Sequence, residues 1–312
     1  MSATLTTPVA LIIFNRPETT ARVFAEIAKA RPSKLLVVAD GPRLDHPEDI
    51  ERCAATRAIV ERVDWRCEVL TNFSEANLGC KMRPVSGLKW VFENVEEAII
   101  LEDDCVPDPS FFPFCQELLE RYRDDERVMM IGGINLLGEW RTVDQSYFFS
   151  ALGGTWGWAT WQRAWRHFDP EIKMWPKALE LQVVEELFPD VRYSSYWKDI
   201  FQKVYDGTIE SAWDYQWLLA CWLQKGWRIV PQVNLVKNIG FGAGATHHQS
   251  EDDPLASMSA REISFPLKHP SVITRDQELD EELSRAFYST RKSPSILHRL
   301  KARVSRTLSE AR

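Results

Sequence analysis

The sequence predicts an α/β protein built on a doubly wound, mostly parallel β-sheet. Across the first hundred residues, short apolar runs alternate with stretches of helical periodicity, and polar or charged residues follow several of the runs. Alternating strands and helices of this length indicate βαβ units. Near-continuous apolar runs are typical of strands buried on both faces of a parallel sheet. The length of 312 residues suits one large domain or two closely joined lobes.

Four strands are expected in the first half, each followed by a helix or a turn. Pro17 stands where a first helix would begin, a position that proline favours. Asp40 and Gly41 end the second apolar run in a turn, and Asp108 is expected to cap a helix that begins at Pro109. The expected elements are strands over 9–14, 35–39, 67–70, 98–101 and 227–230, and helices from Pro17, over 47–61 and around 85–92.

Composition narrows the range of partners and compartments. The formal net charge is -7 and the main body shows no basic patch, so nucleic-acid binding is not expected. The six cysteines form no CxxC pair, which favours free thiols in a reducing cytosol. No signal-peptide pattern and no apolar run of about 20 residues is present, so a cytoplasmic protein is expected.

The strongest functional signal is the acidic triplet Glu102-Asp103-Asp104, which directly follows an apolar strand. Buried charges are costly unless they are paired or bind a metal. One or two carboxylates plus substrate phosphates commonly hold Mg²⁺, and Mn²⁺ favours similar ligands. Side chains alternate along a strand, so Glu102 and Asp104 are expected to face one way and Asp103 the other. A solvated acidic loop is the alternative.

Other polar residues are expected at the same edge, because ligands bind beyond the carboxyl ends of such strands. Arg16 follows the first strand, and its guanidinium suits a diphosphate; a surface arginine is the alternative. Asp40 is a candidate acceptor of hydrogen bonds from the ribose or base of a nucleotide; a residue that only forms a turn is the alternative. Lys81 and Arg83 supply positive charge near phosphate, or are solvated cations at a helix start.

The second half is rich in tryptophan, with eleven of the thirteen between Trp140 and Trp227. Most of these rings are expected in the core. Trp156, Trp158 and Trp213 are the candidates for contact with a sugar. Asp214 lies among aromatic residues, where a raised pKa would suit a general base; an ordinary acid at a helix start is the alternative.

A glycine-rich stretch from Gly240 to Gly244 precedes His247 and His248. It lacks a dinucleotide-binding spacing, and we interpret it as a loop that closes over a bound donor. Either histidine is then a weak candidate for contact with phosphate or metal.

Together these residues resemble the GT-A fold glycosyltransferases, in particular the N-acetylglucosaminyltransferases of N-glycan processing and related bacterial proteins. The resemblance covers roughly residues 8 to 250. The segments that carry it are Phe14-Asn15-Arg16, Asp40-Gly41, Glu102 to Phe112, Gly153 to Trp161 and Trp213-Asp214. The chain departs from the pattern in having Tyr215-Gln216 before the next tryptophan, which loosens the assignment of Asp214.

The resemblance implies an inverting, Mn²⁺- or Mg²⁺-dependent transfer of a hexosyl or N-acetylhexosaminyl group, usually from a UDP-sugar, to a glycan or lipid-linked acceptor. It implies that Asp104 binds the metal and that Asp214 is the catalytic base. Donor contacts would come from Asn15, Arg16, Asp40, Lys81, Glu102 and Asp103. A nucleotidyltransferase that makes nucleotide-sugars and a non-catalytic carbohydrate-binding protein are the alternatives.

We expect a nucleotide-sugar-binding half over 1–135, an acceptor-side and catalytic half of the same domain over 136–250, and an extension over 251–312. From Arg285 onwards the extension holds eight Lys/Arg and one acid. As a helix, the 291–312 tail is amphipathic and cationic, which makes it a candidate for peripheral contact with the inner face of an anionic membrane. A solvated or docked terminal helix is the alternative.

Overall fold

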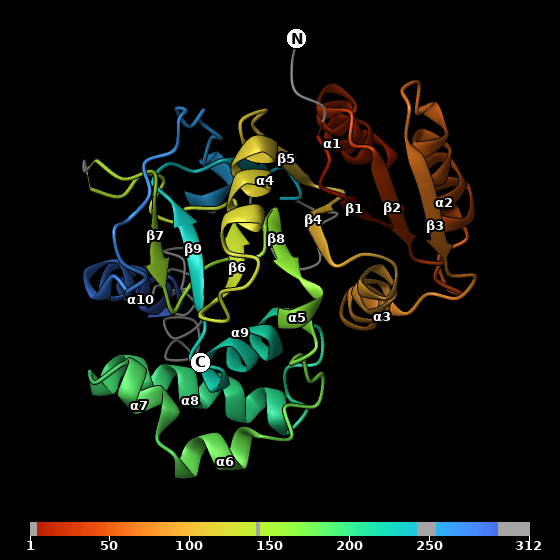
Figure 1. The fold of residues 1–312 in the computed structure, drawn as a ribbon. Helices are drawn as coiled ribbons and strands as arrows, with labels where there is room; N and C mark the ends of the chain where they lie inside the picture. The colour runs from red at the N-terminus through yellow and green to blue at the C-terminus, as the bar shows by residue number, and fades with distance from the viewer. Residues whose placement is uncertain (1–4, 142–143, 242–253, 293–312) are drawn as a thin grey trace, which may run out of the picture.

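The computed structural model describes residues 5–141, 144–241 and 254–292. Its centre is one eight-stranded sheet of order β3-β2-β1-β4-β8-β6-β9-β7 (Figure 1). The strands are β1 (Val9–Ile13), β2 (Lys34–Ala39), β3 (Glu68–Phe73), β4 (Glu97–Glu102), β6 (Val128–Gly132), β7 (Tyr147–Ser150), β8 (Trp158–Trp161) and β9 (Trp227–Pro231). The predicted α/β class is confirmed.

The sheet is mixed but mostly parallel. Strands β1 to β4 are mutually parallel, whereas β8 runs antiparallel between β4 and β6, and β7 runs antiparallel to β9 at the edge. Six strands therefore share one direction and present their carboxyl ends at one edge. Strands from both sides of residue 135 lie in this single sheet, which joins the two expected halves.

Helices cover both faces of the sheet, because consecutive strand residues point to opposite sides. One face packs on α1 (Pro17–Ala30), the end of α2 (Glu48–Ile59) and α4 (Phe111–Arg121). The other face packs on α3 (Gly79–Asn94), α5 (Gln162–Trp165) and α9 (Asp214–Leu223). In β1, for example, Leu11 packs on the side of α1, α2 and α4, and Ile12 packs on the side of α3, α5 and α9.

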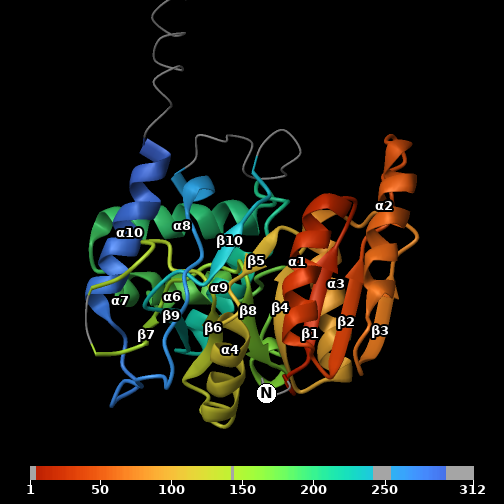
Figure 2. The ribbon, with the colours of Figure 1, turned by 90° about the horizontal axis from the view of Figure 1, so that it is seen from above.

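A further helical layer lies at one end of the molecule. It contains α6 (Trp175–Glu180), α7 (Val183–Leu187) and α8 (Val191–Tyr205) (Figure 1). These helices pack with α9 and α10 (Gln277–Lys292) around a hydrophobic core that is separate from those on the two faces of the sheet. Figure 2 shows α10 and α2 at opposite ends of the molecule. None of the helices in the described ranges has the length and apolar character that a membrane span needs.

Two details differ from the sequence-based expectations. The helix expected from Pro109 begins at Phe111, because Asp108 Oδ1 accepts hydrogen bonds from the Ser110 backbone N–H and hydroxyl and turns the chain before the helix. Strands β6, β7 and β8 were not expected, and β8 lies in the tryptophan-rich segment. All six cysteines are free, as expected.

Asp280 fastens α10 to the edge strand β7. Its buried carboxylate accepts hydrogen bonds from Ser150 Oγ, Ala151 N and Arg275 Nε. Asp280→Asn should lower the free energy of unfolding by about 1.5–3 kcal/mol, because Arg275 loses a charged partner. Urea unfolding would measure the change. Glu278→Gln is the matched control, since Glu278 is exposed and a surface pair is worth about 0–1 kcal/mol.

Candidate active site

The register of the sheet brings the ends of β1 and β4 together. Ile12 pairs with Glu102, so the acidic triplet lies beside the residues that follow β1. The Phe14 N–H donates to Asp103 Oδ2 at 3.1 Å and fixes the turn after β4 against the end of β1. The sheet therefore assembles Arg16 and the triplet at its carboxyl edge, as the sequence indicated.

Arg16 bridges two carboxylates of the triplet. Its Nη1 donates to Asp104 Oδ2 at 2.9 Å, and its Nη2 lies 2.5 Å from Asp103 Oδ1. The expected alternation is therefore wrong beyond Glu102. Strand β4 ends at Glu102, and Asp103 and Asp104 form a turn that directs both carboxylates to one guanidinium.

The triplet places three carboxyl groups side by side, and two of them have little access to water. Asp103 is 1% and Asp104 8% exposed. Burial raises the pKa of Glu102 well above its usual range, and repulsion from Asp104, Asp103 and Asp214 raises it further. Burial opposes the charged form of Arg16, but the attraction of Asp103 and Asp104 outweighs it and raises the pKa of Arg16.

The packing of its neighbour places Asp214 on the side of the triplet, since the Trp213 ring contacts Trp158 of β8, the strand beside β4. Asp214 is the first residue of α9, and its charge acts on Glu102 although 112 positions separate them in the chain. It is partly exposed, whereas its neighbour Trp213 is buried. The fold thus brings the candidate base to the edge of the sheet that holds Arg16 and the acidic turn.

Asp40 has a full set of partners within the protein. Its Oδ1 accepts from the N–H groups of Gly41 and Leu78 at 2.9 Å each. Its Oδ2 accepts from Gly79 N at 3.0 Å and from Asn77 Nδ2 at 3.1 Å. A carboxylate offers about four lone-pair sites, so none is left for a ribose or base. The predicted donor contact is not supported here; Asp40 instead holds the start of α3 against the end of β2.

The other basic and amide candidates divide into three cases. Asn15 donates its amide to Asp49 Oδ1 at 2.5 Å, so its side chain is engaged by α2. Lys81 lies in the first turn of α3, partly buried, and makes no hydrogen bond or ion pair with residues that the structure describes. Arg83 is buried and donates to the Ala39 and Asn72 carbonyls, so it is neither a solvated cation nor free for phosphate.

The tryptophan predictions require correction. Trp158 is the first residue of β8, has no exposed surface, and packs against Trp213 and Trp217 with ring centroids 5.8 and 6.0 Å apart. Trp213 is only 6% exposed in the same cluster. Neither ring presents a face to a sugar in this conformation. Trp156 is partly exposed, and its ring meets Phe241 edge-on at 5.8 Å, so it remains a candidate.

The sequence did not indicate how closely Gly240 lies to the acidic turn. Strand β10 (Val236–Asn238) pairs with β5 (Cys105–Pro107), and the Ile239 N–H donates to the Asp104 carbonyl at 2.8 Å. A Cβ on Gly240 would lie 2.1 Å from Asp104 Oδ2. The glycine-rich composition was the available signal. The remainder of that stretch, with His247 and His248, lies outside the described residues.

Gly240→Ala should displace the Asp104 carboxylate and weaken metal-dependent nucleotide binding about tenfold or more, because a real Cβ does not approach a heavy atom so closely. Calorimetric titration with UDP and Mn²⁺ would measure it. Gly207→Ala is the control: its φ of 73° makes alanine cost about 1–2 kcal/mol, but no atom would crowd the new Cβ. Equal binding by both variants would show that Asp104 accommodates the methyl group.

The residues at the acidic turn fit a divalent cation that also binds substrate. Asp103 Oδ1 is buried and accepts no hydrogen bond of good geometry despite its short ion pair with Arg16. Within the described residues, no group of three or more His, Cys, Asp or Glu side chains is arranged to hold a metal ion. A cation here would therefore take one or two carboxylates and complete its shell with water and phosphate, as Mg²⁺ usually does.

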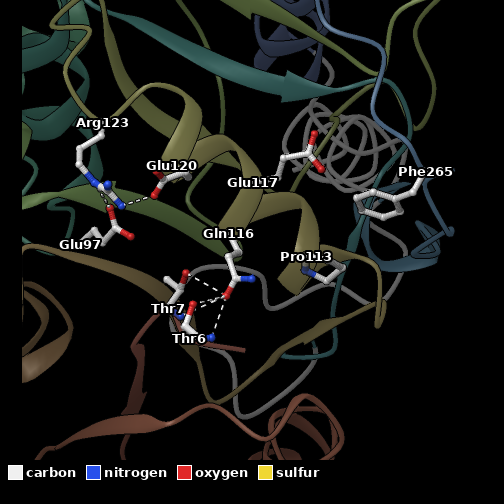
Figure 3. Close-up of a pocket in the computed structure, with 9 residues that line it drawn as sticks. All are labelled: Thr6, Thr7, Glu97, Pro113, Gln116, Glu117, Glu120, Arg123 and Phe265. Carbon is white, nitrogen blue, oxygen red and sulfur yellow. Dashed lines mark hydrogen bonds and ion pairs between the residues drawn. The ribbon is translucent and has the colours of Figure 1, made fainter. Parts of the chain in front are cut away.

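A pocket of about 460 Å³ lies elsewhere (Figure 3). Thr6 and Thr7 precede β1, and Glu97 is the first residue of β4, so the pocket opens at the amino ends of these strands. It is remote from the acidic turn at the carboxyl ends. In its wall, Gln116 Oε1 accepts hydrogen bonds from the backbone N–H groups of Thr6 and Thr7. None of the predicted site residues that the structure describes lines this pocket.

Comparison with known proteins adds little to this geometry. No protein-family model and no curated protein matches the chain. Among solved structures, S. aureus TarS 1–349 is 12% identical, with a TM-score of 0.36 over 52% of this chain and 48% of that chain. UDP-glucose pyrophosphorylase complexed with UDP-glucose is 11% identical, with a TM-score of 0.27 over 47% of this chain and 64% of that one. The matches thus span less than two thirds of either neighbour, and at these scores neither bears on the activity of this chain.

Proposed function

We propose that this protein is a metal-dependent glycosyltransferase that moves a sugar from a nucleotide-diphosphate donor to an acceptor hydroxyl. The observation that carries the proposal is the meeting of Arg16, the Glu102–Asp104 turn and Asp214 at the carboxyl edge of the sheet. A diphosphate needs cationic partners and an acceptor hydroxyl needs a base, and this edge has candidates for both tasks.

The donor would lie across the ends of β1 and β4. The Arg16 guanidinium would bind phosphate oxygens through parallel hydrogen bonds. Lys81 would add positive charge from the first turn of α3, where its ammonium is not engaged by described residues. The start of α3 is held in place by Asp40, so the position of Lys81 depends on Asp40 even though Asp40 itself has no free lone pair.

Mn²⁺ or Mg²⁺ held by Asp104, with Asp103 close by, would neutralise the charge that develops on the diphosphate leaving group. Glu102 and Asp103 would contact the nucleotide. Asp214 would accept the proton of the acceptor hydroxyl, whose oxygen attacks the anomeric carbon from the face opposite the phosphate and inverts its configuration. Trp156 at the margin of the site would pack against a sugar ring.

Donor and acceptor classes follow from the resemblance. We propose a UDP-sugar as donor, transfer of a hexosyl or N-acetylhexosaminyl group, and a glycan or lipid-linked acceptor in polysaccharide biosynthesis. We also propose cytoplasmic action with contact to the membrane through the 291–312 tail, of which residues 293–312 lie outside the described residues. Liposome co-sedimentation that is lost on truncation at Arg291 would test this contact.

Calorimetry with UDP, GDP and dTDP, each with and without Mn²⁺, tests the function directly. Micromolar binding of one nucleotide that requires the metal is expected. Glycan binding without any nucleotide affinity would replace the proposal with a carbohydrate-binding protein. Release of pyrophosphate from a nucleoside triphosphate and a sugar phosphate would replace it with a nucleotidyltransferase.

A further inference from the structure

The only cation that contacts the acidic turn within the described residues is the guanidinium of Arg16. It lies between Asp103 and Asp104 at 2.5 and 2.9 Å, where it neutralises two carboxylates that are almost fully buried. Unpaired buried charges are strongly unfavourable. In this structure Arg16 thus neutralises the two carboxylates, as a divalent cation would do when a donor is bound.

The main chain and the side chain of Arg16 have separate sets of partners. Its backbone carbonyl accepts from the Thr20 N–H and hydroxyl, which fixes the main chain at the start of α1. Within the described residues its guanidinium contacts no partner other than the two carboxylates, and the side chain is 28% exposed. Asp103 Oδ1 accepts no well-directed hydrogen bond from it. The contact with Asp103 is therefore an ion pair without a well-directed hydrogen bond, whereas Asp104 accepts one from Nη1.

We propose that Arg16 is an exchangeable counter-ion. It occupies the acidic turn in the absence of ligand, and it leaves Asp103 and Asp104 for the donor diphosphate when a divalent cation takes its place. This inference rests on the proposed function and adds to it a mechanism of ordered assembly. A free metal ion must displace Arg16, whereas a metal ion arriving with a diphosphate gives Arg16 a new anionic partner.

The consequence is positive coupling between metal and nucleotide. Each ligand removes part of the cost of binding the other, and the coupling must be equal in both directions. An arginine that stayed between the carboxylates would also repel a metal ion, but it would do so equally with and without nucleotide. Arg16→Gln would then raise Mn²⁺ affinity and leave the gain in Mn²⁺ affinity on adding UDP unchanged. The two cases differ in an equilibrium that involves no catalysis.

The test is titration of Mn²⁺ alone, followed by free-ion paramagnetic resonance or calorimetry, with wild type, Arg16→Gln, Arg16→Lys and Arg127→Gln. Arg16→Gln should bind Mn²⁺ about 5- to 150-fold more tightly than wild type, the usual range for such coupling. Arg16→Lys should lie between them, because lysine keeps the charge but not the fork. Arg127→Gln removes an arginine whose ion pair, within the described part of the chain, is with Asp125, and it should match wild type.

A second titration, with UDP at saturating Mn²⁺, should show weaker binding by Arg16→Gln and a smaller gain in Mn²⁺ affinity on adding UDP. Thermal unfolding would show whether Arg16→Gln is misfolded. If it is, Arg16→Lys replaces it in the comparison with wild type. If both Arg16 variants bind Mn²⁺ as wild type does, the exchange is disproved while the metal site stands. If no protein binds Mn²⁺ even with UDP present, the proposed metal-dependent function fails, and this inference fails with it.

Discussion

Asp214→Asn is expected to leave donor binding unchanged and to lower the turnover number by about 10²–10⁴-fold, the range that general base catalysis supplies. The amide preserves the shape of the side chain at the start of α9 but cannot accept a proton. Because Asp214 also repels Glu102, its neutralisation removes one unfavourable charge from the site. Donor affinity should therefore not fall. Steady-state kinetics and UDP calorimetry would separate the two effects.

The matched control is Asp199→Asn. Asp199 is an exposed acid on α8 that pairs with Lys203 one turn away, a contact worth little. It should leave both turnover and donor binding unchanged. If Asp214→Asn retained wild-type turnover, another group would have to take the proton, and Asp214 would become an ordinary acid at a helix start.

Asp104→Ala is expected to abolish metal-dependent nucleotide binding. Asp104 is the proposed metal ligand; one of its oxygens contacts Arg16, and Gly240 packs against its side chain. Calorimetry with UDP and Mn²⁺ should show no metal-dependent heat at concentrations that saturate wild type. The change also leaves Arg16 with Asp103 alone, and a modest shift in the melting temperature is expected with it.

Tight UDP binding by Asp104→Ala without metal would refute the assignment of this site. Asp108→Ala provides a nearby comparison, because Asp108 turns the chain before α4 and touches neither Arg16 nor the triplet in any contact described. It should lose stability but retain metal-dependent binding. The pair of variants separates damage to the fold from damage to the site.

The sequence predicted the elements whose pattern is local. The apolar runs that became β1, β2 and β4 carry the signal of strands buried on both faces, and the residues after them fall at one edge by topology alone. Arg16 and the acidic triplet could therefore be placed together in advance. The start of α9 at Asp214 was also visible as an acid at a helix start.

What failed depended on tertiary partners. Asp40 looked available, but four donors from the turn after β2 and the start of α3 fill its oxygens. Trp158 was predicted to contact a sugar, yet β8 inserts between β4 and β6 and buries it. An aromatic ring suits a core and a sugar platform equally well, so composition could not separate them. The turn at Asp103 likewise depends on the Phe14 N–H.

The central place of β1 has a consequence for how the site comes into being. The contact between Arg16 and Asp104 closes a loop of 88 positions, and β1 lies between β2, the next strand along the chain, and β4, which is synthesised much later. The entropy cost of closing a long loop must be met before the contacts between its ends can stabilise the chain. The site therefore requires the β1–β4 pairing, and a partly folded chain that lacks this pairing holds its acidic turn without Arg16.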